Sequence, residues 1–444
     1  MNIAVFLKNN LKNIPPSIGQ KINILPYEYR PGIGKIYKTR KQEIRQLELA
    51  NKEEKQDFVF KRVKSLVDFS YKHIPFYRTY YDTNSFHPDD LMSFGDIQKI
   101  PIITKSILNQ SKLEQRSYKR KGRYIVNTGG SSGTPFGFYI EPDSIGHEWA
   151  HMHTIWEKLG YKTSDFKLGF GGRSDVNNFV DYDVVRNTFA IDIYASYSEI
   201  CKRLKQILKK YHVNYLHGYP SSIYDFAIYC ETFDQELTSI LKEQLKGAFL
   251  GSEYPHKYYR DKIETVFDIK TISWYGHTER AVLAYEKERP FNYSPFLSYG
   301  FSEAILNEEN EYNLVSTSYY NYASPLIRYN TEDIIEDPIV QNGILDSFLI
   351  LKGRNGEFVV DKDNKSINLT GLIFGRHHEI FNYANFVQVK QIRKGVIEIV
   401  YVGNIAENKA ASLFDSNNLN FDITFKRVNE PIRSVSGKVS LLIK

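Results

Sequence analysis

The sequence predicts an α/β protein, with a large N-terminal domain built on a parallel sheet and a small mobile C-terminal α+β domain. From about residue 167 to residue 275, apolar strand-like runs alternate with helix-like segments, which is typical of a parallel sheet. After about residue 290, short strands and turns replace this alternation. We place the boundary in the stretch GRNG, whose glycines permit a hinge, giving domains 1–353 and 354–444.

The elements of this alternation follow from local patterns. A helix is expected over 143–160, with Asp143 as its cap, Gly160 as its end and an apolar stripe of Trp149, Met152, Trp156 and Leu159. Strands are expected over 167–170, 214–217, 247–250 and 271–275, and helices over 197–211, 221–233 and 257–267. Polar loops at the ends of such strands are where parallel sheets bind ligands.

The flanking regions are less regular. Prolines interrupt residues 1–40, which predicts an irregular arm, and residues 41–74 have the spacing of one helix that ends before Pro75. In the C-terminal region, residues 396–402 and 421–428 alternate as strands.

The composition limits the classes of protein to which the chain can belong. The 444 residues are 42% hydrophobic and 25% charged, which is normal for a soluble globular protein. The net charge of +6 is mild, so no nucleic-acid partner is expected. The two cysteines suit a reducing compartment, and neither a signal peptide nor a membrane-spanning run is recognised. We therefore expect a cytoplasmic protein.

The stretch TGGSSGTP lies between two β-prone runs within residues 124–140. Small residues let backbone N–H groups approach an anion, and the hydroxyl groups add donors, so a phosphate-clasping loop is one interpretation. A polar hairpin turn is the other. The Walker A pattern is absent from this stretch.

The stretch HEWAH, from His147 to His151, matches the H-E-x-x-H pattern of zinc proteases. A catalytic zinc needs a third protein ligand, but no H-x-x-G-x-x-H continuation follows, and the window about 20 residues downstream holds no Glu, although it holds Asp175. A solvated helix face and a helix that lines a substrate pocket are the alternatives.

Six stretches in order resemble the motifs of the adenylate-forming (acyl- and aryl-CoA synthetase) superfamily, namely TGGSSGTPF, GSEYPHKYYRDKIETVF, WYGHTE, IRYNTEDI, LKGRNGEFV and IRSVSGKVSLLIK. The N-terminal stretches HIPFYRTYY and DIQKIPIITKSIL resemble the arm of phenylacetate–CoA ligase and its CapK-like relatives. The resemblance covers nearly the whole chain and implies the two-domain fold of these enzymes.

The resemblance implies an AMP-forming carboxylate ligase that converts a carboxylic acid and ATP to an acyl-adenylate and then transfers the acyl group. CoA is the default acceptor, and an amine or a sugar in surface-polysaccharide biosynthesis is the alternative. A zinc hydrolase and a non-catalytic binding module are the rival classes. The implied ligands are ATP and Mg²⁺, with CoA possible; the sequence names neither the acid nor the oligomeric state.

The resemblance also implies residue roles. The phosphate clasp would be Thr128, Gly129, Gly130, Ser131, Ser132, Gly133 and Thr134. Thr278 would donate to the α-phosphate, Glu279 would hold Mg²⁺, and Lys438 would reach the α-phosphate and carboxylate oxygens. The remaining nucleotide-binding residues would be Gly251, Ser252, Glu253, Tyr275, Gly276, Asp333 and Arg354. The acyl pocket would be bordered by His217, Gly218, Tyr219 and Pro220, which otherwise form a helix-capping turn.

Three departures from the family pattern are specific. Phe136 stands where many relatives carry a lysine, so Lys438 is expected to supply more of the positive charge. Glu332 replaces a glycine beside Asp333, and Gly356 replaces a charged hinge residue. For Glu279, Asp333 and Lys438 the alternatives are a surface carboxylate, a turn residue and an exposed lysine.

Overall fold

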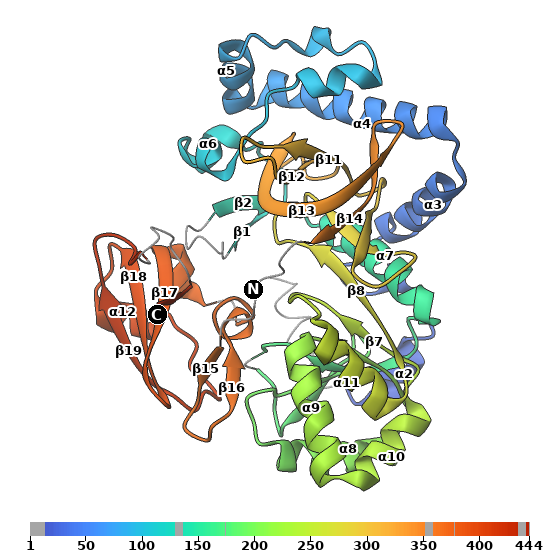
Figure 1. The fold of residues 1–444 in the computed structure, drawn as a ribbon, viewed down its shortest axis with the longest axis vertical. Coiled ribbons are helices and arrows are strands. Elements are labelled where there is room, and N and C mark those ends of the chain that lie inside the picture. Colours follow the sequence, from blue (N-terminus) through green and yellow to red (C-terminus); the bar gives the residue numbers. More distant parts are fainter. Residues whose placement is uncertain are drawn as a thin grey trace.

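The computed structural model describes residues 14–128, 136–173, 175–350, 358–376, 378–433 and 441–443. Its centre is a mixed twelve-stranded sheet with the strand order β11-β12-β13-β14-β10-β9-β8-β7-β6-β3-β5-β4 (Figure 1). One half of this sheet is mainly parallel and the other half is antiparallel, and the two halves join where β8 pairs antiparallel with β9.

The parallel half confirms the predicted alternation. Its parallel strands are β3 (Phe166–Phe170), β5 (Thr188–Ile191), β6 (Val213–Gly218), β7 (Gly247–Leu250) and β8 (Lys270–Gly276), with β4 (Val180–Asp183) antiparallel at the edge. The helices are α8 (Tyr197–Leu208), α9 (Pro220–Phe233), α10 (Gln235–Gln244) and α11 (Lys257–Phe267). β4, β5 and α10 were not expected from the sequence.

The antiparallel half carries the strands after residue 280. They are β9 (Leu283–Glu286), β10 (Asn292–Pro295), β11 (Gly300–Leu306), β12 (Tyr312–Ser318), β13 (Tyr329–Gln341) and β14 (Ile344–Ile350). Consecutive β11, β12, β13 and β14 pair antiparallel, which matches the expected change from helix-containing units to short strands.

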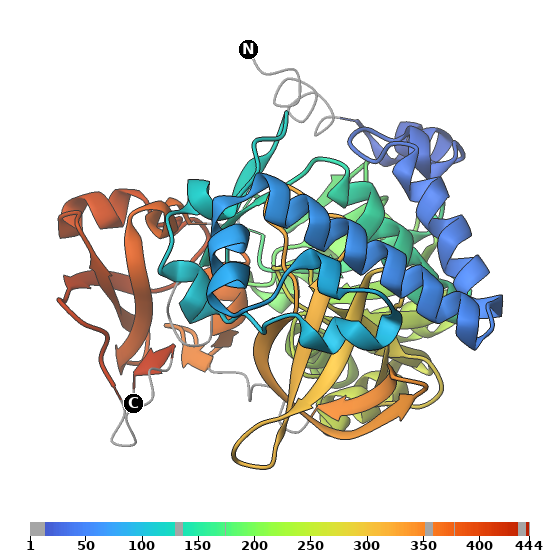
Figure 2. The same cartoon turned by 90° about the horizontal axis from the view of Figure 1, so that it is seen from above.

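The N-terminal region is more helical than predicted. It holds α2 (Pro16–Ile22), α3 (Ile36–Leu49), α4 (Lys52–His73), α5 (Pro75–Thr83) and α6 (Lys105–Asn109), with α4 running across the molecule in Figure 2. The single helix over 41–74 is wrong, because Asn51 begins a new helix through a capping box with Glu54. Short 3₁₀ turns are η1 (Tyr27–Tyr29), η2 (Pro88–Asp90), η3 (Phe94–Lys99), η4 (Leu113–Arg116) and η5 (Glu157–Leu159).

The predicted strands around TGGSSGTP are confirmed. β1 (Tyr124–Thr128) and β2 (Phe136–Ile140) pair antiparallel, with Thr128 opposite Phe136. α7 (Ser144–Trp156) follows, and Gly160 ends this segment in the left-handed conformation with φ of 78°. Asp143 holds the predicted N-cap position of α7. Its side chain makes no capping hydrogen bond, however, so the prediction that this side chain caps the helix is wrong.

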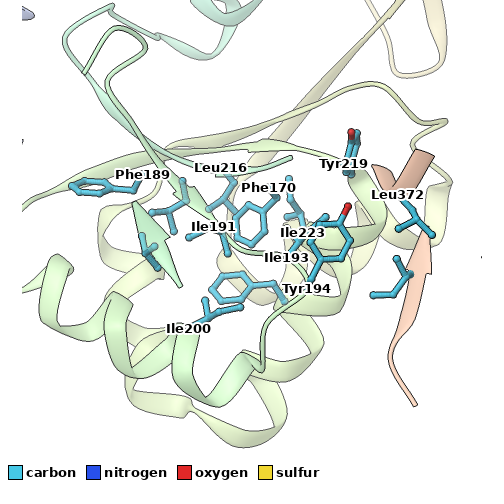
Figure 3. Close-up of a cluster of buried hydrophobic side chains, with 14 of the residues drawn as sticks. Phe170, Phe189, Ile191, Ile193, Tyr194, Ile200, Leu216, Tyr219, Ile223 and Leu372 are labelled. Carbon is cyan, nitrogen blue, oxygen red and sulfur yellow. The ribbon is translucent and has the colours of Figure 1, made fainter. Parts of the chain in front are cut away.

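The C-terminal region forms a separate four-stranded sheet in the order β19-β18-β17-β20 (Figure 1, left). Its elements are β15 (Phe358–Val360), β16 (Ser366–Asn368), η6 (Thr370–Phe374), η7 (Glu379–Asn382), β17 (Ala384–Arg393), β18 (Val396–Gly403), α12 (Glu407–Ser412), β19 (Asp422–Arg427) and β20 (Leu442–Ile443). Leu372 shares one buried cluster with Tyr219 of the large region (Figure 3). The predicted boundary at 353/354 lies outside the described residues.

Within the described ranges, every helix is too short or too polar to cross a membrane.

Candidate active site

Three predicted stretches meet at one edge of the parallel sheet. The segments that begin at His217, Gly251 and Tyr275 lie at the ends of β6, β7 and β8, which run parallel. Gly251 N donates to Gly218 O at 3.1 Å, which joins two of these loops directly. In parallel α/β sheets, ligands bind in the crevice outside the carboxyl ends of the strands. The chain therefore brings the residues expected for the acyl pocket and for the nucleotide to the edge where a ligand would bind.

The turn after β8 holds a partly buried histidine–glutamate pair. His277 Nδ1 lies 3.0 Å from Glu279 Oε2, and the Glu279 side chain is 14% exposed. The surface-carboxylate alternative for Glu279 is therefore wrong. Burial alone would raise the pKa of Glu279, but the hydrogen bond and charge of His277 lower it below its usual range. Thr278 between them is exposed, so its hydroxyl is accessible to a ligand.

Asp333 joins this turn from the antiparallel half of the sheet. The Tyr275 hydroxyl donates to Asp333 Oδ2 at 2.5 Å, across 58 residues of sequence. Asp333 lies within β13, so it is not merely a turn residue. Glu332 beside it has φ of 63°, a left-handed conformation that favours glycine. This backbone geometry gives a physical reason for a glycine at this position of the motif that the sequence resembles.

A buried lysine that the sequence did not single out approaches the same carboxylates. Lys105 is 7% exposed, and its positive charge contributes to lowering the pKa of Glu279 and of Glu332. Burial raises the pKa of Glu332 overall, with Asp333 and Glu279 adding to the increase. Lys105 ends the stretch IPIITK, and the sequence resemblance places this stretch only in the N-terminal arm, not in the site.

Lys105 is held near Asp333 because Ile103, two residues before it, pairs with the first residue of β13. Ile103 forms a parallel bridge with Tyr329, in which Ile103 N donates to Arg328 O at 3.1 Å and Asn330 N donates to Ile103 O at 2.8 Å. The Arg328 guanidinium donates to the carbonyls of Gln98 and Ile100 at 2.6 and 2.7 Å. Both carboxylate oxygens of Glu303 also accept from Arg328, each at 3.0 Å. The N-terminal arm is therefore held rigidly at the strand that carries Asp333.

Phe136 anchors the hairpin that carries the predicted clasp. Its side chain is fully buried, and the Arg116 guanidinium lies 4.6 Å from the ring centroid. A lysine here would place an ammonium group in an apolar core, which explains why an aromatic residue suits the position. Of the remaining predicted residues, Gly129, Gly130, Ser131, Ser132, Gly133, Thr134, Arg354, Gly356 and Lys438 lie outside the described residues.

Positive φ angles occur near the site, as they do elsewhere in the described chain. Ser252, Arg280 and Arg328 have φ of 66°, 56° and 43°, although none is glycine. Such conformations cost roughly 1–3 kcal/mol each. Arg280 Nη1 donates to Ser144 Oγ at 2.9 Å, so the strained turn after β8 also holds the start of α7.

Glu253 is a second buried acid at this edge. Its Oε2 accepts from Ser221 N at 3.2 Å, while Oε1 is buried without a partner among the described residues. Burial raises the pKa of Glu253 to about 7, and Asp225 adds to the increase. A protonated Glu253 at neutral pH can donate a hydrogen bond, which an ionised carboxylate cannot do.

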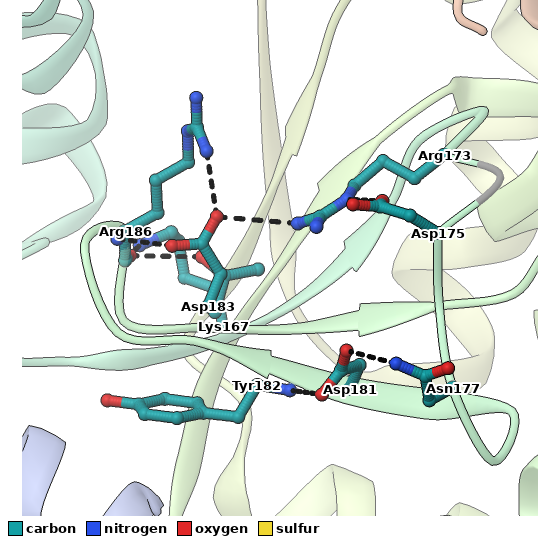
Figure 4. Close-up of polar contacts among 9 residues, drawn as sticks. Lys167, Arg173, Asp175, Asn177, Asp181, Tyr182, Asp183 and Arg186 are labelled. Carbon is teal, nitrogen blue, oxygen red and sulfur yellow. Dashed lines mark hydrogen bonds and ion pairs between the residues drawn. The ribbon is translucent and has the colours of Figure 1, made fainter. Parts of the chain in front are cut away.

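The HEWAH stretch does not form a zinc site in the described structure. His151 uses both ring nitrogens, Nδ1 with His147 O and Nε2 with Ser298 Oγ, each at 2.9 Å. Asp175 instead pairs with Arg173 at 3.0 Å (Figure 4). No described group of three or more His, Cys, Asp or Glu side chains is arranged to hold a metal.

The solvated-face alternative for HEWAH is also wrong. His147 and His151 are 6% and 0% exposed, because α7 packs against α3 on one side and the sheet on another. Glu148 contacts the turn after β8, accepting from the Tyr299 hydroxyl at 2.5 Å and lying 3.8 Å from Arg280. α7 is therefore a largely buried helix that packs beside the turn after β8.

The HGYP stretch combines both interpretations made from the sequence. Pro220 lies in the first turn of α9 and Tyr219 is its N-cap residue, so the stretch does begin a helix. His217 meanwhile contacts two tryptophan rings that are also neighbours of each other, with centroid distances of 4.8 Å to Trp156 and 5.9 Å to Trp274. Its ring borders the crevice and does not form part of the cap.

Comparisons with known proteins agree with this architecture. No model of a known protein family matches the chain. Protein CapK of Staphylococcus aureus is 24% identical over 356 residues, covering 77% of this chain and 74% of CapK. The 2-hydroxyisobutyryl-CoA ligase in its postadenylation state matches with a TM-score of 0.51 at 16% identity, covering 87% of this chain and 89% of that one.

The same ligase in its thioesterification state, in complex with 2-HIB-AMP and CoA, matches with a TM-score of 0.53 at 15% identity over 88% of this chain and 90% of that one. These similarities define the class: the chain has the fold of the adenylate-forming ligases. The resemblance predicted from the sequence motifs is confirmed at the level of the fold.

Proposed function

We propose that the protein is an AMP-forming carboxylate ligase of the phenylacetate–CoA ligase and CapK-like type. One observation carries the proposal: the Tyr275–Asp333 hydrogen bond unites two nucleotide motifs at the crevice, beside the partly buried Glu279. These are the residue types that adenylation requires, namely a carboxylate for the ribose hydroxyls and a carboxylate for the metal.

The first step joins the acid to AMP. A carboxylate oxygen of the acid attacks the α-phosphorus of ATP, and the bond to the bridging oxygen breaks, so pyrophosphate leaves. In this proposal Asp333 accepts from the ribose hydroxyls, while Thr278 donates to the α-phosphate. Glu279 would hold Mg²⁺, since a carboxylate oxygen suits this cation, and the bound Mg²⁺ would neutralise phosphate charge.

Positive charge for the transferred group would come from two lysines. Lys105 is buried beside Glu279 and Glu332, and we propose that it faces the phosphates in place of the lysine that Phe136 replaces. Lys438 would complete the charge from residues 354–444, acting as a lid domain over residues 1–353. Movement of the lid would then admit the acceptor for the second step.

The second step transfers the acyl group from AMP to an acceptor. We propose CoA, whose thiolate sulfur would attack the acyl carbon and release AMP. An amine or a sugar hydroxyl is the alternative acceptor for the same adenylate. Adding CoA, an amine or a sugar separately to preformed adenylate distinguishes them, because each gives a product of different mass.

Exchange of labelled pyrophosphate into ATP tests the first step. The proposal expects exchange that depends on an added acid and is lost in Asp333→Ala and Lys438→Ala. Lys394→Ala, at a lysine exposed on the C-terminal sheet, serves as the matched control for Lys438→Ala. Absence of exchange with every acid, or full exchange in both variants, would contradict the proposal.

A further inference from the structure

Aromatic rings of the chain itself occupy the crevice where the acid would lie. The Trp274 ring lies on the backbone of Gly251, since a Cβ added there would be 2.1 Å from Trp274 Cζ2. The His217 ring then stacks on Trp274, with an angle of 28° between the planes. The ends of β6, β7 and β8 are thereby covered by rings from two of the three strands.

A continuous aromatic floor lies behind these rings. Trp156 stacks on Phe249 at 4.7 Å with an interplanar angle of 6°, and Phe249 stacks on Tyr215 at 4.8 Å and 20°. All three side chains are fully buried. Close-packed interiors do not yield to an inserted ring without displacing their own side chains, so this floor limits how deep an acid extends.

The crevice also offers one polar ring without a hydrogen-bond partner in the described part of the chain. Among the described residues, the half-buried His217 ring makes no hydrogen bond, whereas Trp156 lies fully buried in the floor behind it. Burial, with Lys167 adding to it, lowers the pKa of His217 to about 3. The ring is therefore neutral at pH 7 and presents one donor and one acceptor. A polar group of the acid bound beside this ring would give it a hydrogen-bond partner.

We infer that the acid activated here is short and carries a hydrogen-bonding group, a hydroxyl or an amine, close to its carboxyl. Trp274 and Trp156 exclude an aryl or long-chain acid, while His217 pairs with the polar substituent. This inference rests on the proposed function, because it places the acid at the ends of β6, β7 and β8.

Acid specificity in pyrophosphate exchange provides the catalytic test. The wild type is expected to favour lactate or alanine over propionate by about 10-fold or more, because the analogue without the substituent leaves His217 unpaired. His217→Phe should remove this preference. Trp274→Ala should increase exchange with phenylacetate by about 10-fold, whereas Phe233→Ala, at an aromatic residue exposed at the end of α9, should not. A wild type that prefers phenylacetate would overturn the inference.

A binding test separates the inference from the proposed function. Two of the three tryptophans in the chain contact His217, so their fluorescence reports an acid in the crevice without any catalysis. We expect lactate or alanine to change it saturably in the wild type, and phenylacetate to do so only in Trp274→Ala. If exchange fails with every acid but this pattern holds, the proposed function fails, while the inferred preference for binding a short acid with a polar substituent stands. Saturable phenylacetate binding to the wild type would overturn the inference.

Discussion

The two halves of the central sheet contribute to the site in different ways. The parallel half supplies loops that follow directly from consecutive strands, so His217, Gly251 and Tyr275 meet because β6, β7 and β8 are neighbours. The antiparallel half supplies Asp333 and, through the bridge to Ile103, Lys105. Local topology thus assembles the side where we propose that the acid binds, whereas long-range pairing assembles the proposed charged side.

Two buried arginine–glutamate pairs, one within the antiparallel half and one joining the two halves, test this difference most strongly. Arg328–Glu303 holds the N-terminal arm, and Arg260–Glu286 lies beside the seam of the sheet at 2.7 Å. Arg328→Met and Arg260→Met should each lower the free energy of unfolding by about 3–5 kcal/mol, because a buried carboxylate loses its partner. Urea unfolding measures this loss.

Activity separates the two variants. Arg328→Met should also raise the KM for ATP, because Lys105 loses its anchorage, while Arg260→Met should leave it unchanged. Lys61→Met, which removes an exposed pair with Asp57, should cost no more than about 0.5 kcal/mol. Equal KM values in both arginine variants would remove the distinction between the halves.

Glu253 provides a pH test in the parallel half. Its folded pKa of about 7 lies above the ordinary value of 4.5, so its favourable contribution is complete below pH 4.5 and is lost as the pH rises through 7. Glu253→Gln should therefore be more stable than the wild type at pH 8, by up to about 3 kcal/mol, with little difference at pH 4.5. Thermal unfolding at both pH values measures this, with the exposed Glu243→Gln as control. A pH-independent difference would contradict the assigned cause.

Lys105 tests the charged side directly. Lys105→Met should lower kcat/KM for ATP in pyrophosphate exchange by about 100-fold, the size of losing one group that stabilises charge in the transition state. Lys105→Arg should recover part of the activity, since it keeps the positive charge. Lys99→Met, at an exposed lysine paired with Asp96 on the same arm, should behave as the wild type. If Lys105→Met retained full activity, the lysine would be structural only.

Glu332 gives the smallest expected effect. Glu332→Gly should raise the free energy of unfolding by about 1 kcal/mol, because glycine tolerates the positive φ. It should also lower the KM for ATP by removing a negative charge near the phosphates. Asn342→Gly is the control, since asparagine tolerates its φ of 55° and lies in the hairpin turn between β13 and β14. An unchanged KM in Glu332→Gly would place this carboxylate away from the nucleotide.

The sequence predicted the parallel half well because its signals are local. The bounds of β7 and α11 agree with the prediction, and alternation with turn residues was sufficient to place them. The division of α3 from α4 was missed although Asn51 and Glu54 carry a capping box. α10 was missed because it follows α9 with a single residue, Asp234, between them.

The charged side of the site was predicted only through family motifs. Asp333 came from the resemblance, and its contact with Tyr275 spans 58 residues, beyond what periodicity indicates. Lys105 was missed because its position depends on the bridge between Ile103 and Tyr329, which no local pattern encodes. The burial of His147 was missed for the same reason, since α3 covers α7 from a distant part of the sequence.

The most direct measurement of the central claim is mass spectrometry of the products formed from ATP and a short hydroxy or amino acid when no acceptor is present. The account predicts an acyl-adenylate bound to the wild-type protein and an equal amount of pyrophosphate, neither of which forms with Asp333→Ala. ADP and phosphate as products, or intact ATP with every acid tested, would contradict it.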